Sequence, residues 1–198
     1  MIPNCEYYYK NTSEELDVVL CGSSHGMEAD LIQELYKAGK MKERSIVIFN
    51  YPYHDRLEKR GMGDDLSEEI EALEGVLKLC RAETYKKVKL LGKSIGAVIA
   101  AKYLTSLAKE TQLRFELVVL GYDLGWIKTK DFVGKITIIQ GEKDPFGGID
   151  LVKKDMEGAS SVDIIYYEIK GADHGYKEPE TGYPKYVKEV VDLVFEER

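Results

Sequence analysis

Short apolar runs rich in β-branched residues alternate along this chain with longer segments of helical period, and this alternation restricts the fold more than any other feature. It predicts an α/β fold, in which a mostly parallel sheet is covered by helices on both faces. We expect about seven strands, at residues 6–10, 16–21, 45–50, 87–91, 115–121, 136–141 and 163–170. Several of these runs are apolar at consecutive positions, which is typical of strands inside a sheet.

Apolar residues at three- and four-residue steps predict amphipathic helices between the strands. One such series is Leu66, Ile70, Leu73, Leu77 and Cys80, and another is Tyr183, Val187, Val190, Val194 and Phe195. We expect Pro184 in the first turn of the last helix and Gly39 at the end of an earlier one.

Length and composition favour one domain over residues 1–198. The chain has 28 basic and 35 acidic residues without long blocks of one sign, so nucleic acid is not an expected partner. It has no signal-like start and no apolar run of membrane-spanning length, so we expect no membrane partner and a cytoplasmic location. Cys5, Cys21 and Cys80 are widely spaced, which argues against a disulfide framework or a thiolate zinc site.

The segment Gly92-Lys93-Ser94-Ile95-Gly96 follows a buried strand and precedes a helix rich in small residues. This G-x-S-x-G pattern is typical of a sharp turn that exposes a nucleophilic serine, and side chains at the two glycines would collide with neighbouring backbone. A helix-capping serine is the structural alternative. A phosphate-binding P-loop is excluded, because that motif needs glycine at the position of Lys87.

A serine needs a base to remove its proton, and in this motif's fold the acid and base follow the serine in the chain. His174 is the one histidine downstream of Ser94. It lies in a glycine-flanked loop before the last predicted helix. Asp144, directly after a predicted strand, is the best candidate to orient the imidazole. Glu142 or Asp123 could hold that role instead.

With serine, acid and base in this order, the chain resembles the α/β-hydrolase superfamily, specifically its short capless members similar to dienelactone hydrolases and small carboxylesterases. The resemblance covers nearly the whole chain and implies that Ser94, Asp144 and His174 form a catalytic triad. The backbone N–H of Ile95 is expected to be one donor of the oxyanion hole. The other is expected in the 22–26 loop, with Ser24 favoured over Ser23, because the family's His-Gly pair is displaced here to His25-Gly26.

Loops at the predicted carboxyl edge of the sheet supply the candidate substrate contacts, for which packing in the core is the competing interpretation. The candidates are Ser23, His25, Tyr51, Tyr53, Tyr122 and Phe146, with Trp126 and Tyr176 as further aromatic residues nearby. We expect His54 to face solvent. A Cys21/His25 dyad is possible in principle, but Cys21 ends a buried strand, where an inert thiol is expected.

About fourteen residues separate the strand that ends near Gly121 from the strand that begins near Ile136. This leaves no room for a lid and predicts an open site suited to small or flexible acyl groups. The sequence thus predicts a serine hydrolase, carboxylesterase-like or thioesterase-like, that acts on a small ester or thioester. A peptidase or amidase on the same triad, or a hydrolase-like binding or scaffold protein, is the alternative.

The three histidines lie far apart and lack zinc-ligand spacing, so we expect no metal and no cofactor. The expected partner is a small-molecule acyl substrate, and both a monomer and a homodimer remain open.

Overall fold

The computed structural model describes residues 3–59, 65–127, 129–161 and 163–196. Seven strands form one sheet in the order β1-β3-β2-β4-β5-β6-β7, with β1 antiparallel to β3 and the other neighbours parallel. The strands are β1 (Cys5–Tyr8), β2 (Glu15–Leu20), β3 (Ser45–Phe49), β4 (Lys87–Lys93), β5 (Phe115–Leu120), β6 (Lys135–Gly141) and β7 (Ile164–Ile169). The predicted α/β class is confirmed, and each strand lies within two residues of its expected position.

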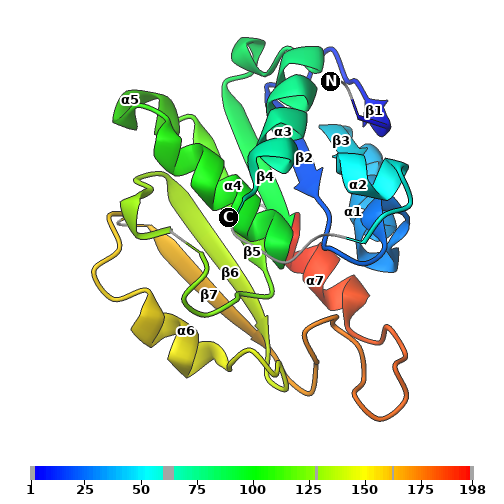
Figure 1. Cartoon of the computed structure of the whole chain (residues 1–198), viewed down its shortest axis with the longest axis vertical. Helices are drawn as coiled ribbons and strands as arrows, with labels where there is room; N and C mark the ends of the chain where they lie inside the picture. Colours follow the sequence, from blue (N-terminus) through cyan, green and yellow to red (C-terminus); the bar gives the residue numbers. More distant parts are fainter. Residues whose placement is uncertain (1–2, 60–64, 128, 162, 197–198) are drawn as a thin grey trace.

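Helices cover both faces of the sheet, as Figure 1 shows. On one face α1 packs against α7, and on the other α3 packs against α4 while α6 covers β7. The helices are α1 (Asp30–Met41), α2 (Pro52–Asp55), α3 (Ser67–Leu79), α4 (Ile95–Ser106), α5 (Lys109–Gln112), α6 (Ile149–Asp155) and α7 (Val187–Val194). Among the described residues, none of these helices combines the length and apolar character needed to cross a membrane.

Two local expectations about helix ends were wrong. Gly39 lies inside α1 and is needed for close packing, because a Cβ there would come 2.7 Å from Cδ1 of Ile46 on β3. The chain turns after α1 at Glu43, which has a φ of 55°. Pro184 precedes α7, whose first residue is Val187, so it sits in the turn before the helix.

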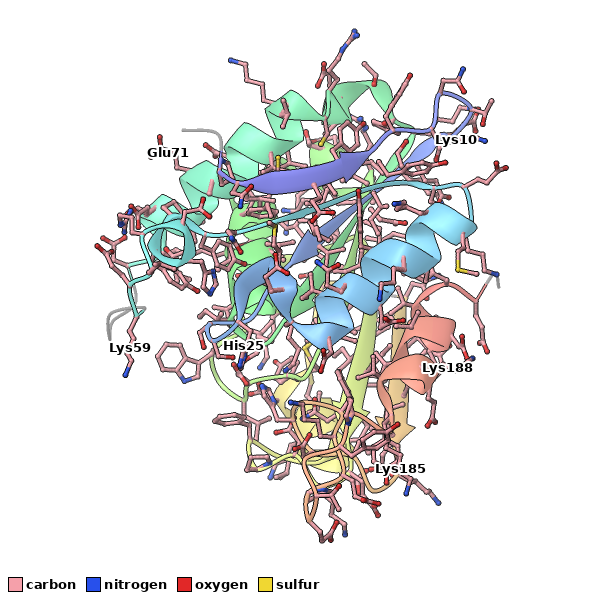
Figure 2. All side chains as sticks on the ribbon, turned by 90° about the vertical axis from the view of Figure 1, so that its right-hand side faces the viewer. Lys10, His25, Lys59, Glu71, Lys185 and Lys188 are labelled. Atoms are coloured by element: carbon pink, nitrogen blue, oxygen red, sulfur yellow. The ribbon has the colours of Figure 1, made fainter. Side chains whose placement is uncertain are left out.

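The order of the strands indicates where along the sheet a ligand site is expected. The chain passes from β2 to β3 on one side and then returns to β4 on the other side of β2, so the loops after β2 and β4 diverge. In open parallel sheets such a reversal point leaves a crevice at the carboxyl edge. The loop after β2 carries His25, which lies below and to the left of Lys10 in Figure 2.

The connection from β5 to β6 is short. Leu120 ends β5 and Lys135 begins β6, and within the described part of this connection the one regular element is a single 3-10 turn at Thr129–Asp131. The described residues of this connection form no lid helix over the carboxyl edge, as the sequence predicted.

Candidate active site

Ser94 stands on a strained turn between β4 and α4. Its φ of 50° and ψ of −117° lie outside the regions that ordinary residues prefer, and its backbone N–H donates to Leu120 O at 3.0 Å. The neighbouring strand thus helps hold the turn. The side chain is half-buried and lines a cleft of about 370 Å³.

The two glycines of the pentapeptide are required by close approach of backbone. A Cβ at Gly92 would lie 2.4 Å from both the N and Cα atoms of Ala97, and a Cβ at Gly96 would lie 2.5 Å from Leu20 O. Both distances are far below van der Waals contact, so a side chain at either position has to displace the turn or β2.

We therefore expect Gly96→Ala to lower the free energy of unfolding by about 3 kcal/mol, since the added methyl group meets rigid backbone. Thermal or urea unfolding followed by circular dichroism measures this change. Gly148→Ala is the matched control, because a Cβ at Gly148 has nothing within 4 Å, and it should cost less than about 1 kcal/mol. Equal stability of the two variants would contradict the packing argument.

His174 and Asp144 meet at the carboxyl edge of the sheet. Asp144 follows β6, its side chain is completely buried, and its Oδ2 lies 2.7 Å from His174 Nδ1. The other oxygen, Oδ1, accepts the Phe146 N–H at 2.9 Å, which fixes the carboxylate in a tight turn. Of the three acidic residues considered, Asp144 is the one that contacts Nδ1, while Glu142 accepts the Gly171 N–H at 2.8 Å. This geometry sets the tautomer that leaves Nε2 free to act as an acceptor.

Asp123 lies between the serine and the histidine. Ser94 Oγ donates to Asp123 Oδ2 at 3.1 Å, and Asp123 Oδ1 lies 3.9 Å from His174 Nε2. His174 Nε2 is buried and has no hydrogen-bond partner in the described part of the chain. The serine hydroxyl thus bonds to a carboxylate here and not to the imidazole, an arrangement that the order of motifs in the sequence did not reveal.

The glycine-rich loop after β2 forms the facing wall of the cleft. Ser23, Ser24 and His25 line the cleft together with Ser94 and His174, and His25 Nδ1 lies 2.8 Å from Ser24 Oγ. Ile95 is the first residue of α4, where a backbone N–H has no acceptor within its own helix. Of the residues predicted for the oxyanion hole, Ser24 lines the cleft, and Ile95 directly follows Ser94, which also lines it. Their role stays a prediction.

The predicted aromatic contacts divide into two groups. Phe146 is 54% exposed and, although it is not among the residues that line the cleft, its ring meets the His174 ring edge-to-face at 4.8 Å. Tyr51, Tyr53 and Tyr122 are buried, and none of them lines the cleft. Their predicted place in the pocket wall is wrong, because their rings fill the core beneath the loops.

Two other expectations are settled by burial. His54 was expected to face solvent, but it is half-buried and its ring lies 4.2 Å from the Tyr53 ring, so this expectation was wrong. Cys21 is buried, and burial raises the pKa of its thiol to about 12, which agrees with an inert thiol. Its sulfur lies 3.9 Å from His54 Nδ1, and His25 instead contacts Ser24.

Lys93 is the site residue that the sequence did not single out. It ends β4 directly before the nucleophile, its stem lines the cleft, and its Nζ atom is buried. The signal available was its position directly before Ser94 in the chain.

A family profile described as "Alpha/beta hydrolase domain" matches residues 15–192, and the chain belongs to this family. Solved structures with the same fold include an alpha-beta serine hydrolase homologue from Coxiella burnetii, with a TM-score of 0.72 and 19% identity over 97% of this chain and 91% of that one. A dienelactone hydrolase from Anabaena variabilis has a TM-score of 0.72 and 15% identity over 96% and 88% of the two chains.

A lidless a/b serine hydrolase from Xanthomonas campestris has a TM-score of 0.69 and 17% identity over 96% of this chain and 85% of that one. Among curated proteins the comparison found no match. The predicted membership of the capless α/β hydrolases is thus confirmed.

Proposed function

We propose that this chain is a serine hydrolase that cleaves a small carboxylic ester or thioester through an acyl-enzyme on Ser94. The observation that carries this proposal is the contact of buried Asp144 with His174, 2.7 Å apart, where His174 lines the same cleft as a serine held at positive φ. A buried carboxylate that orients an imidazole beside a serine on an open cleft is the arrangement that acyl transfer requires.

In the first step the Ser94 hydroxyl leaves Asp123, turns toward His174 Nε2 and gives up its proton as Oγ attacks the substrate carbonyl carbon. The C=O π bond opens and the negative charge collects on the carbonyl oxygen. The N–H groups of Ile95 and of the Ser24 segment stabilise this oxyanion. The carbonyl then re-forms, the bond to the leaving group breaks, and the imidazolium protonates the departing oxygen or sulfur.

In the second step a water molecule replaces the leaving group. His174 accepts one of its protons, the resulting hydroxide attacks the acyl carbon, and the bond to Ser94 breaks as Oγ regains a proton. The open cleft and the exposed ring of Phe146 beside His174 favour a small or flexible acyl group over a long chain that would need to be enclosed.

A fluorophosphonate probe tests this proposal directly, because it reacts with an activated serine and is not a substrate. We expect the probe to add once per chain and mass spectrometry to place the adduct on Ser94. The chain should then be assayed with short p-nitrophenyl esters, thioesters and peptide anilides. We expect it to hydrolyse the esters and thioesters.

Turnover of anilides alone would favour an amidase or peptidase. Probe addition at a residue other than Ser94, or the absence of both labelling and turnover, would contradict the proposal and favour a binding or scaffold protein.

A further inference from the structure

A buried lysine ammonium lies beside the candidate triad without a hydrogen bond. Lys93 Nζ has no accessible surface and no hydrogen-bond partner among the residues that the structure describes. Burying a charged group in this way is costly unless nearby charges compensate for it. Burial of an ammonium directly before the nucleophile, in spite of this cost in stability, points to a functional role.

The ammonium is close to the imidazole. A Cβ built on Gly121 would lie 2.9 Å from both Lys93 Nζ and His174 Cε1, so these two atoms are no more than about 6 Å apart. Gly121 has a φ of 76° and leaves the space that both groups occupy. On another side, Nζ lies 5.8 Å from the centroid of the Tyr176 ring.

The imidazole itself is flanked by two carboxylates. Asp144 contacts Nδ1 at 2.7 Å, and Asp123 lies 3.9 Å from Nε2. Both negative charges favour the imidazolium, which cannot accept the Ser94 proton. A positive charge about 6 Å from the ring opposes them in a water-poor site, where charges interact more strongly than in bulk solvent.

Several other ionisable groups lie near the imidazole, and among those described Lys177 is a second lysine, on the lining of the cleft. The charged or titratable groups facing His174 are Lys93 from β4, Asp123 after β5, Asp144 after β6, Asp173, Tyr176 and Lys177 of its own loop, and His25 across the cleft. Asp173 accepts the Gly175 and Lys177 N–H groups. Burial raises the pKa of Tyr176 well above its usual value, so its phenol stays neutral.

Lys93 carries its charge at neutral pH. Burial lowers the pKa of Lys93 to about 8, and the carboxylates of Asp144, Asp123 and Asp173 oppose a larger drop. Most molecules therefore hold an ammonium at pH 7, and the charge is lost above about pH 8.

We propose that Lys93 is a positioning residue: its buried ammonium offsets the carboxylates of Asp123 and Asp144 and keeps the His174 imidazole neutral, able to accept the Ser94 proton. This inference rests on the hydrolase function proposed above. Its direct consequence is that removing the ammonium and removing the Asp123 carboxylate shift the protonation of His174 in opposite directions.

The test is a titration of ¹⁵N-labelled histidine by NMR, which does not depend on turnover. The chain has three histidines, and the His174 signal is assigned from its absence in His174→Gln. Lys93→Met keeps an unbranched stem without the charge, and we expect it to raise the pH midpoint of His174 by about one to two units. Asp123→Asn should lower the midpoint, and the double variant should lie between the single variants.

Lys87→Met is the matched control, because Lys87 is an exposed lysine at the other end of β4. It should leave the midpoint within about 0.3 units of the wild type. With an ester that the wild type hydrolyses, kcat/KM of Lys93→Met should be about 10- to 100-fold lower than that of the wild type at acidic pH. It should approach the wild-type value above pH 8.

An unchanged His174 midpoint in Lys93→Met would overturn the inference. Inactivity of the wild type towards every acyl substrate would instead overturn the proposed function, so the two failures are distinct. Because the lowered pKa of Lys93 shows that its charged form is disfavoured in the folded chain, Lys93→Met should not lower the unfolding temperature at pH 7, and circular dichroism checks that the variant is folded.

The same variant tests the charge of Lys93 through stability. Because the pKa of Lys93 is lower in the folded chain than the ordinary value of 10.5, the unfolded chain binds the extra proton between about pH 8 and 10.5. Wild-type stability should therefore rise relative to Lys93→Met across this range.

Discussion

Replacing Ser94 by alanine is expected to lower kcat/KM for short esters by about 10⁴- to 10⁶-fold, because no acyl-enzyme can form and the remaining groups only polarise the substrate. Within the part of the chain that the structure describes, the hydroxyl makes one side-chain hydrogen bond, to Asp123 Oδ2 at 3.1 Å, so its loss should leave the fold intact. Initial rates with p-nitrophenyl acetate and butyrate measure the effect, and the fluorophosphonate probe should no longer label the chain.

Ser106→Ala provides the control for this experiment. Ser106 is the last residue of α4, the same helix that Ser94 precedes, and its exposed hydroxyl bonds only locally to Tyr103 O. Its rate should equal that of the wild type. Equal rates for Ser94→Ala and the wild type would show that the observed hydrolysis does not use this serine.

The part of the site that could be predicted from sequence is the part encoded locally. The turn around Ser94 depends on Gly92 and Gly96, whose need for backbone space is independent of the rest of the chain. The strand before it is apolar at consecutive positions, and such runs mark buried parallel strands. For the same reason the ends of the parallel strands, and with them Asp144 and His174, were placed at one edge of the sheet.

Contacts that depend on how loops fold over that edge could not be predicted. Asp123 was considered as a substitute for Asp144, but its bond to Ser94 follows from the course of the loop after β5. Lys93 reads in the sequence as a polar residue in a turn, and the burial of its Nζ comes from Gly121 and Tyr176 on two other segments. Each of these contacts joins residues that are distant in the chain.

The aromatic residues show a second limit. Tyr51, Tyr122 and Phe146 all follow strands and look alike in sequence, yet the first two are completely buried while Phe146 is half-exposed. The difference lies in the partners of the rings and hydroxyls: Tyr51 packs on Phe49, and the Tyr122 hydroxyl donates to Asp155. A large ring with a polar tip suits both core and cleft, so residue type alone does not decide between them.

Asp144→Asn is expected to lower kcat by about 10⁴-fold and so to decide which of the three acidic residues orients the base. The amide can present N–H groups to His174 Nδ1, which then holds the tautomer that places a proton on Nε2, where the Ser94 proton has to go. Glu142→Gln, which alters a residue bonded to Gly171, should leave the rate unchanged. Asp123→Asn should cost no more than about tenfold near pH 7, because its carboxylate contacts the serine and not Nδ1. A loss of about 10⁴-fold in Asp123→Asn with little loss in Asp144→Asn would reverse the assignment. It would mean that the imidazole ring rotates during the reaction and is oriented by Asp123 in place of Asp144.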